Sequence, residues 1–409
     1  MKLLKVDSVE QARQKLLDYV GSWKLDRQII SMEACFGRIL AEDIYSSEDM
    51  PAFRRSTVDG YAVLSKDTAA AGESIPVFLT YVGEVEMGKA ADCPIGSGQC
   101  VYVPTGGMVP EGADAVVMVE YSEEFGKEGI ALYTSATYGE NIVQIGEETE
   151  KGDKLLERGK RLQAQAVGVL AAAGVVNVPV YKPLRLTLIS TGDELVSPEA
   201  PLHLGQIRDV NTFALKGLAE KNDFTVVKNL IIPDDEEKLV NAAKEAMSFS
   251  DIVAISGGSS QGKKDVTRVV IDRISSPGVF THGIALKPGK PTILGYDELS
   301  GTLMVGLPGH PVSAFMVFEL LLCDLNRHLN KSVKPPAIPA RVSINVPSSP
   351  GKSTCYPVTL KQEDGGYSAI PVFGKSGLIT TLTRADGYFT IERDREGLSA
   401  GDVVFVHLF

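Results

Sequence analysis

Strands alternate with helices through the second half of the chain, and this alternation restricts the fold more than any other feature. Apolar runs typical of buried strands occur at 184–190, 225–232, 252–255, 279–286 and 302–306. Stretches typical of helices lie between and after them, at 212–221, 235–247, 266–274 and 312–329. Such alternation predicts an open α/β sheet, whose ligand crevice lies at the carboxyl ends of the strands.

The turn at residues 256–265 is the most informative loop of this region. It follows the apolar run 252–255, is rich in glycine and serine, and precedes a predicted helix. Free backbone N–H groups at such a junction favour an anion, and glycine lets a ligand approach the backbone. A tight connection that needs glycine for geometry alone is the alternative. The candidate phosphate contacts are Gly257, Gly258, Ser259, Ser260, Gly262 and Lys264.

This turn nearly matches the P-loop pattern, with Gly257, four intervening residues, Gly262 and Lys263. The match fails at Lys264, because the pattern requires a Ser or Thr whose hydroxyl binds Mg²⁺, and a lysine cannot bind a cation. We therefore expect an anion site of another kind. A P-loop-like phosphotransferase is the minor alternative.

Three more loops are expected at the same sheet edge, at residues 191–195, 205–211 and 306–313. A solvated surface explains any one of their charged residues alone. It explains poorly why glycine and charge recur at successive strand ends. The carboxylates that are candidates to hold Mg²⁺ through oxygen belong to Glu194, Asp209 and Asp265.

A proline-stiffened turn with two lysines, KPGKP at 287–291, follows the predicted strand 279–286. Lysines on such a turn neutralise anionic charge, as Lys264 and the N–H groups of the glycine turn are expected to do for a phosphate. Lys287 and Lys290 are therefore candidates to bind a second, compact oxyanion.

The other segments are typical of small β domains. Residues 76–121 alternate short apolar runs with turn signals, and the tail from 334 predicts a β-barrel. Asp59 and Thr105 lie on polar turns, which residue type alone interprets as ordinary turns. The predicted domains are a discontinuous N-terminal helical and linker domain (1–48 and 140–181), a small β domain (49–139), an α/β domain (182–332) and a C-terminal β-barrel (333–409).

Composition describes an ordinary globular protein and argues against several partners. The 409 residues exceed what one core usually supports, which predicts about two to four domains. A net charge of −11 argues against nucleic acid or an acidic membrane surface as partner. The five scattered cysteines contain no C-x-x-C pair, which argues against a disulfide framework or zinc and favours the cytoplasm. We find no apolar run long enough to span a bilayer.

Six motifs in order carry a resemblance that covers nearly the whole chain. They are FRRSTVDGYAV, PTGGMVPEGADAVV, STGDEL, SGGSSQGKKD, KPGKP and GLPGHPVSAF. This series resembles the molybdopterin molybdenumtransferase family, which includes MoeA and the E domain of gephyrin. The resemblance implies an elongated four-domain protomer that dimerises, with an α/β domain of molybdopterin-binding type. It also implies a reaction that consumes adenylylated molybdopterin and molybdate, with Mg²⁺, and gives molybdenum cofactor and AMP.

The resemblance also implies roles for single residues. Asp209 and Asp265 match the carboxylates that serve the metal and the phosphoanhydride, with Glu194 beside them. Asp59 and Thr105 match residues that the family presents to the α/β site of the partner subunit, which replaces their interpretation as ordinary turns. The matches to the molybdate pocket are Lys287, Lys290, Pro291 and, from the tail, Ser376. The substrate-binding set further includes Pro308, Gly309 and Pro311 of GLPGHP.

The chain departs from the family pattern at several positions. The motif Arg-x-x-Gly-Glu-Asp is replaced by residues 143–148, which lack the arginine and end in Glu148. Arg208 replaces the tyrosine that is common in the family, and Lys263 replaces an acidic residue. Arg54 replaces Asp or Asn, and His310 replaces the Asn of GLPGNP. The added positive charge leaves tungstate open as the oxyanion.

The sequence therefore predicts a cytoplasmic, Mg²⁺-dependent molybdenum insertion enzyme that forms a homodimer with shared active sites. A molybdopterin adenylyltransferase and apo-molybdoenzymes are the candidate protein partners. The alternative is a non-catalytic scaffold with the same fold, as the resemblance to gephyrin allows. The retained Asp209 and Asp265 argue against the scaffold.

Overall fold

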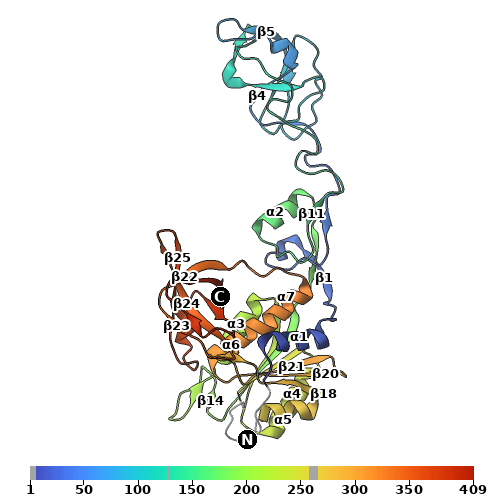
Figure 1. Ribbon diagram of the computed structural model, residues 1–409. Helices are drawn as coiled ribbons and strands as arrows, with labels where there is room; N and C mark the ends of the chain where they lie inside the picture. Colours follow the sequence, from blue (N-terminus) through green and yellow to red (C-terminus); the bar gives the residue numbers. More distant parts are fainter. Residues whose placement is uncertain (1–5, 127–128, 258–265) are drawn as a thin grey trace.

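The computed structural model describes residues 6–126, 129–257 and 266–409. These residues form an elongated molecule with a small β domain at one end and an α/β sheet beside a β-barrel at the other (Figure 1). In the described residues no helix has the length and apolar character needed to cross a membrane.

The small β domain is built on a sheet with the strand order β7-β4-β6-β5-β9-β8. Adjacent residues of β4 enter different cores, Tyr61 on one face and Ala62 on the other, so both faces of the sheet are covered. The strands are β4 (Gly60–Val63), β5 (Val77–Glu84), β6 (Gln99–Val103), β7 (Ala115–Met118), β8 (Ser122–Phe125) and β9 (Gly129–Leu132).

A linker region joins this domain to the rest of the molecule (Figure 1). Its core unites segments from both sides of the β domain, with Leu40 packed in the same cluster as Leu162, Leu170 and Val180. Three short strand pairs and one helix make up this connection. They are β1 (Arg27–Ser31) with β12 (Asn177–Tyr181), β2 (Ile44–Tyr45) with β11 (Lys154–Leu156), β3 (Arg55–Ser56) with β10 (Ile142–Val143), and α2 (Ala164–Ala172).

The α/β domain contains the predicted open sheet, with the strand order β16-β13-β17-β21-β20-β18. The four strands from β16 to β21 run parallel, and β20 and β18 add an antiparallel edge. The strands are β13 (Leu184–Thr191), β16 (Phe224–Ile232), β17 (Ile252–Ser256), β18 (Pro277–His282), β20 (Ile293–Asp297) and β21 (Thr302–Leu307).

The antiparallel edge differs from the sequence prediction of a single strand at 279–286. β18 ends at His282 because Gly283 follows with φ of 90°, which turns the chain. The chain returns as β20, a strand that the sequence analysis missed. The Gly283 N–H donates to the Thr292 carbonyl at 2.7 Å and closes the loop that contains KPGKP.

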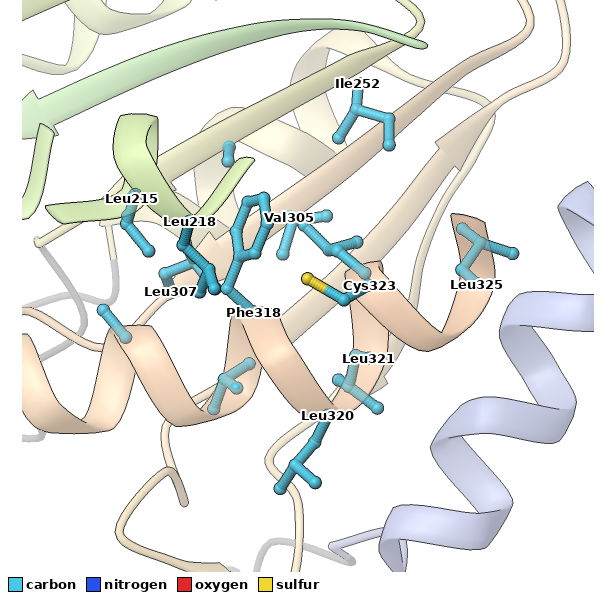
Figure 2. Close-up of a cluster of buried hydrophobic side chains, with 14 of the residues drawn as sticks. Leu215, Leu218, Ile252, Val305, Leu307, Phe318, Leu320, Leu321, Cys323 and Leu325 are labelled. Atoms are coloured by element: carbon cyan, nitrogen blue, oxygen red, sulfur yellow. The ribbon is translucent and has the colours of Figure 1, made fainter. Parts of the chain in front are cut away.

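Helices cover both faces of this sheet. On one face, α4 and α5 pack against Val253 and Ile255 of the sheet. On the other face, Leu215 of α3 and Phe318 of the long helix that follows β21 pack with Val305 of the sheet (Figure 2). The helices are α3 (Asn211–Lys221), α4 (Glu236–Met247), α5 (Val266–Ile274) and α6 (Pro311–Val317), which continues through a π-helical turn (Phe318–Cys323) into α7 (Asp324–Asn330).

The first helix also belongs to this core. α1 (Val9–Val20) begins with the predicted capping box, in which Ser8 Oγ accepts from the Gln11 N–H and the Gln11 side chain accepts from the Ser8 N–H. Its buried face packs into the α3 and α7 side of the sheet. α1 thus packs with the α/β domain, although the prediction grouped it with residues 1–48.

The tail forms the predicted β-barrel. Its strands pair in the order β24-β25-β22-β28-β26, and β26 pairs back to β24 and closes the ring. β19 (Leu286–Lys287) pairs with β24 and attaches the KPGKP loop to the barrel. The barrel strands are β22 (Ile338–Val342), β24 (Ser353–Glu363), β25 (Gly366–Pro371), β26 (Gly387–Ile391) and β28 (Val403–Leu408).

Candidate functional site

A cavity of about 1400 Å³ lies between the carboxyl ends of the parallel strands and the barrel. The register places Ser190 beside Ser256 and Ser256 beside Leu307, so the loops that follow β13, β17 and β21 emerge together. The predicted loops at 191–195, 205–211 and 306–313 all contribute to the lining, and the turn at 256–265 contributes as far as it is described.

The cavity collects most of the predicted site residues that the structure describes. Those in its lining are Glu194, Asp209, Gly257, Lys287, Lys290, Pro291, Pro308, Gly309, Pro311 and Ser376. Those outside the described residues are Gly258, Ser259, Ser260, Gly262, Lys264 and Asp265, together with the neighbouring Lys263.

Gly257 lies at a position where the backbone leaves no room for a side chain. Its φ is 109°, and a Cβ on it would lie 2.2 Å from the Thr191 carbonyl oxygen. The Gly257 carbonyl accepts from Thr267 Oγ1 at 3.1 Å, which ties the end of β17 to α5. Close contact between strand ends is therefore sufficient to explain this glycine.

Asp209 is a buried carboxylate, and one of its oxygens has no partner among the residues that the structure describes. The residue is 3% exposed, and its Oδ1 accepts from Ser190 Oγ at 3.0 Å and from the Thr212 N–H at 3.1 Å. Its Oδ2 is buried and has no hydrogen-bond partner among the described residues. Burying a carboxylate oxygen without a partner is costly, so this atom fits a site that a bound cation completes.

A hard cation suits this donor set. Mg²⁺ is usually held by one or two carboxylates together with water and substrate phosphates. Asp209 can therefore provide such a carboxylate without a second one from the described residues. Within residues 6–126, 129–257 and 266–409, no three His, Cys, Asp or Glu side chains form a metal-binding group. Glu194 lies in the lining but is exposed. The second predicted ligand, Asp265, lies outside the described residues.

The KPGKP turn adjoins the barrel, since β19 pairs with β24, and hydrogen bonds hold the turn at both ends. The Ile284 N–H donates to the Lys290 carbonyl at 3.0 Å, and Thr292 Oγ1 donates to the Gly289 carbonyl at 2.7 Å. Lys287 is exposed, and its Nζ donates to Ser349 Oγ at 3.0 Å.

The charge of the described lining favours anions. Cationic side chains come from both domains, and one of them, Lys352 at the start of β24, was missed by the sequence analysis because no motif surrounds it. The cations are Arg208, Lys287, Lys290 and Lys352, and the carboxylates are Glu194, Asp209 and Asp234.

One loop connects the carboxylate side of the cavity with the barrel. Asn211 Nδ2 donates to the Gly309 carbonyl at 2.9 Å, and His310 Nδ1 lies 2.8 Å from Ser376 Oγ. The Val312 N–H also donates to the Ser376 carbonyl at 3.1 Å. Ser376 is therefore fixed against the start of α6, although it belongs to the tail.

Asp59 and Thr105 lie elsewhere. Asp59 Oδ1 accepts from the Thr105 N–H at 2.7 Å, so the two predicted residues do meet each other. Both are exposed on the small β domain, and Figure 1 places β4 at the opposite end of the molecule from β21 and α6. The single chain does not bring them to the cavity.

Besides His310, two further departures from the family pattern, Arg54 and Arg208, have hydrogen-bond partners. The Arg54 guanidinium donates to the carbonyls of Ala113, at 2.8 Å, and Pro110, at 3.2 Å, and so fixes a loop of the β domain. Arg208 Nε donates to the Pro198 carbonyl at 2.9 Å beside the cavity. Arg54 therefore acts in folding, whereas Arg208 adds charge to the lining.

Comparisons with known proteins identify the family. Residues 7–174 match the MoeA N-terminal region (domain I and II), residues 187–328 a probable molybdopterin binding domain, and residues 339–409 the MoeA C-terminal region (domain IV). The molybdopterin molybdenumtransferase of Haemophilus influenzae is 32% identical over 408 residues, 98% of each chain. That of Bacillus subtilis is 30% identical over 385 residues, 93% of this chain and 89% of the relative.

A solved structure supports the same assignment. The crystal structure of the molybdopterin biosynthesis MoeA protein from Pyrococcus horikoshii is 30% identical and superimposes with a TM-score of 0.85, covering 99% of this chain and 100% of that one. With matching family models along its length and full-length relatives, the chain belongs to the MoeA family of molybdopterin molybdenumtransferases.

Proposed function

We propose that this chain, as a molybdopterin molybdenumtransferase of molybdenum cofactor biosynthesis, inserts molybdate into adenylylated molybdopterin with Mg²⁺-dependent release of AMP. The observation that supports this most is the buried Oδ2 of Asp209, which has no hydrogen-bond partner in the described part of the chain, in a cavity that also contains Lys287, Lys290 and Lys352. A carboxylate with an unused oxygen suits a cation, and the lysines suit anions. A phosphoanhydride with its metal requires both.

The residues of the chain would divide the work. Asp209, oriented by Ser190 and the Thr212 N–H, would hold Mg²⁺ with Asp265. The bound ion would offset charge on the phosphoanhydride. Water attacks the phosphorus, the phosphoanhydride P–O bond breaks, and AMP leaves.

Molybdate would bind next to this step as a substrate. Lys287 and Lys290 offset its charge, while His310 holds Ser376 beside them. In this proposal both subsites lie in one cavity, so the dithiol of the freed molybdopterin would lie close to molybdate. Two Mo–S bonds would form, and one oxide of molybdate would be displaced and leave as water with the two thiol protons. Holding two reactants together in this way removes much of the entropic barrier of a bimolecular step.

The proposal includes a homodimer with shared sites. Asp59 and Thr105 form a complete turn that is remote from the cavity of its own chain, which is the arrangement expected if the turn serves a second copy. A cytoplasmic location and contacts with a molybdopterin adenylyltransferase and apo-molybdoenzymes are further parts of the proposal.

The test is a reconstitution with purified protein, adenylylated molybdopterin, molybdate and Mg²⁺. We expect AMP release and a cofactor that activates an apo-molybdoenzyme, and we expect chelation of Mg²⁺ to stop AMP release. If neither product forms, the enzyme proposal fails and the scaffold alternative takes its place. A parallel reaction with tungstate determines which oxyanion the cavity prefers.

A further inference from the structure

The lining of the cavity combines charged and apolar residues from both domains. The α/β domain contributes Asp209, the lysines of KPGKP and apolar residues such as Leu202 and Ile207, and the barrel contributes Lys352 and a group of apolar residues. The apolar residues of the barrel wall are Cys355, Tyr356, Pro357, Val372 and Phe373. A ligand that fills both sides must therefore combine anionic groups with an apolar or flat group.

The size of the cavity leads to the same conclusion. Its volume of about 1400 Å³ exceeds the range of about 300–1,000 Å³ that is typical of sites for small molecules. A single oxyanion with a phosphate would leave most of this space unfilled.

Phe373 has an exposed aromatic ring that packs against Tyr356. It is 59% exposed although it lines the cavity, and its ring meets that of Tyr356 edge to face, with centroids 6.1 Å apart and planes at 83°. Tyr356 in turn stacks on the buried Phe389 at 5.7 Å, and its hydroxyl donates to the Pro347 carbonyl. The Val372 N–H donates to the Pro357 carbonyl at 2.8 Å and holds the segment against β24.

A singly exposed phenylalanine on a protein surface needs no explanation. Phe373 differs because it lines a cavity, is braced by the half-buried Tyr356 and shares that cavity with cationic side chains. Flat heteroaromatic rings stack on such side chains, and this contact adds to the apolar area that is buried.

We infer that Phe373, braced by Tyr356, forms a stacking subsite for a flat heteroaromatic ring of the substrate. This inference rests on the proposed function and deepens it, because adenylylated molybdopterin carries two such rings, the pterin and the adenine. Both share the chemistry that the subsite recognises, so the experiment must separate them.

The experiment measures equilibrium binding of AMP and of molybdopterin, each alone, to the full-length protein and its variants. We expect Phe373→Ala to weaken one of the two ligands by roughly tenfold, a loss of about 1.4 kcal/mol, and to leave the other within about twofold. Phe373→Tyr should bind like the unmodified protein because it keeps a flat ring. Phe373→Leu should bind like the alanine variant if stacking, and not apolar contact alone, is responsible.

Phe405→Ala is the matched control. Phe405 lies on β28 of the same barrel, is 64% exposed and lies outside the described lining of the cavity. This variant should bind both ligands normally, and thermal melting should show that both alanine variants are folded.

The outcomes separate the inference from the function on which it rests. If Phe373→Ala binds both ligands normally, or if Phe373→Leu binds as tightly as the unmodified protein, the stacking subsite is overturned while AMP release still supports the proposed function. Equal weakening by Phe405→Ala would also overturn the subsite. If the unmodified protein releases no AMP and binds neither ligand, the proposed function and the inference fail together.

Discussion

The cavity and the Asp59 turn each contain a glycine at a close contact between backbone segments, but the two regions differ in the residues that surround them. In each, a glycine allows two backbone segments to touch, since a Cβ would lie 2.2 Å from the Thr191 carbonyl oxygen at Gly257 and 2.1 Å from the Val117 carbonyl oxygen at Gly60. Asp209 is buried with one oxygen that has no partner among the described residues, whereas the exposed Asp59 is satisfied by the Thr105 N–H.

The difference shows that a well-formed local motif is not yet a site. The cavity combines loops that are far apart in sequence, because a parallel sheet places the carboxyl ends of its strands side by side. The Asp59 turn brings its residues only to the surface of its own domain. In our proposal the turn would act only at the cavity of a second subunit, while the cavity already combines groups from two domains of one chain.

The largest expected effect is at the cavity. Asp209→Asn keeps the shape of the side chain and removes its charge, so we expect AMP release to fall by about a hundredfold or more. Asp297→Asn is the control, because Asp297 is also a buried carboxylate but is hydrogen-bonded to Ser276 and Ser300 at the other edge of the sheet. Normal turnover by Asp209→Asn would exclude the cavity as the site of this step.

The Asp59 turn should show a smaller loss of activity without a loss of fold. Because Asp59 is exposed, Asp59→Ala should change the free energy of unfolding by no more than about 0.5 kcal/mol. AMP release should still fall by about tenfold if the turn completes a site in another subunit. Asp67→Ala is the control, because the Asp67 carboxylate of this domain also accepts a hydrogen bond from a backbone N–H, that of Gly98. Equal activity of the two variants would make Asp59 a structural residue.

The link between the two walls of the cavity should affect molybdate more than AMP release. His310→Ala removes the contact with Ser376 Oγ, so we expect KM for molybdate to rise roughly threefold to tenfold, the size of one lost hydrogen bond of about 1 kcal/mol, with kcat nearly unchanged. His203→Ala, in an exposed loop outside the described lining, is the control. A fall in kcat with an unchanged KM would assign His310 to the chemical step.

The smallest effect is expected at the thiol in the cavity. Burial raises the pKa of the Cys355 thiol to about 11, so at neutral pH it is protonated and unreactive. Cys355→Ala should therefore retain activity within about twofold. Alkylation of Cys355 in the folded protein should remain slow until the pH approaches this pKa. Rapid labelling at pH 8, or loss of activity in the variant, would show that the thiol takes part.

The sequence predicted the α/β sheet well because apolar residues dominate its parallel strands, and those of the central strand β17 form an uninterrupted run from Ile252 to Ile255. It missed β20 because the break at Gly283 depends on a positive φ and a hydrogen bond to Thr292, and neither is visible in the order of residues. The barrel was predicted from the alternating apolar and polar residues of the tail. The pairing of β24 with β26, which closes the barrel, could not be predicted from that pattern.

The candidate site was predicted from motifs, and the cavity brings together every described member that lies at the sheet edge or on the tail. Lys352 and Phe373 were missed because nothing local distinguishes a lysine before a strand or a phenylalanine after one. Only the packing of the barrel against the KPGKP turn places them in the lining of the cavity. The remoteness of Asp59 from the cavity of its own chain was expected only through the family resemblance, which implies an elongated protomer with a site shared between subunits, and no pattern of residues indicates it.

Mixing two inactive variants tests most directly whether the cavity and the Asp59 turn act together. Asp59→Ala and Asp209→Asn each damage one half of the proposed site, and a dimer formed from one of each retains one intact site. After the subunits exchange, equal amounts should recover roughly a quarter of the AMP release of the unmodified protein, since half of the dimers are mixed and each has one working site. Recovery of no activity in mixtures shown to contain mixed dimers would contradict a site shared between subunits.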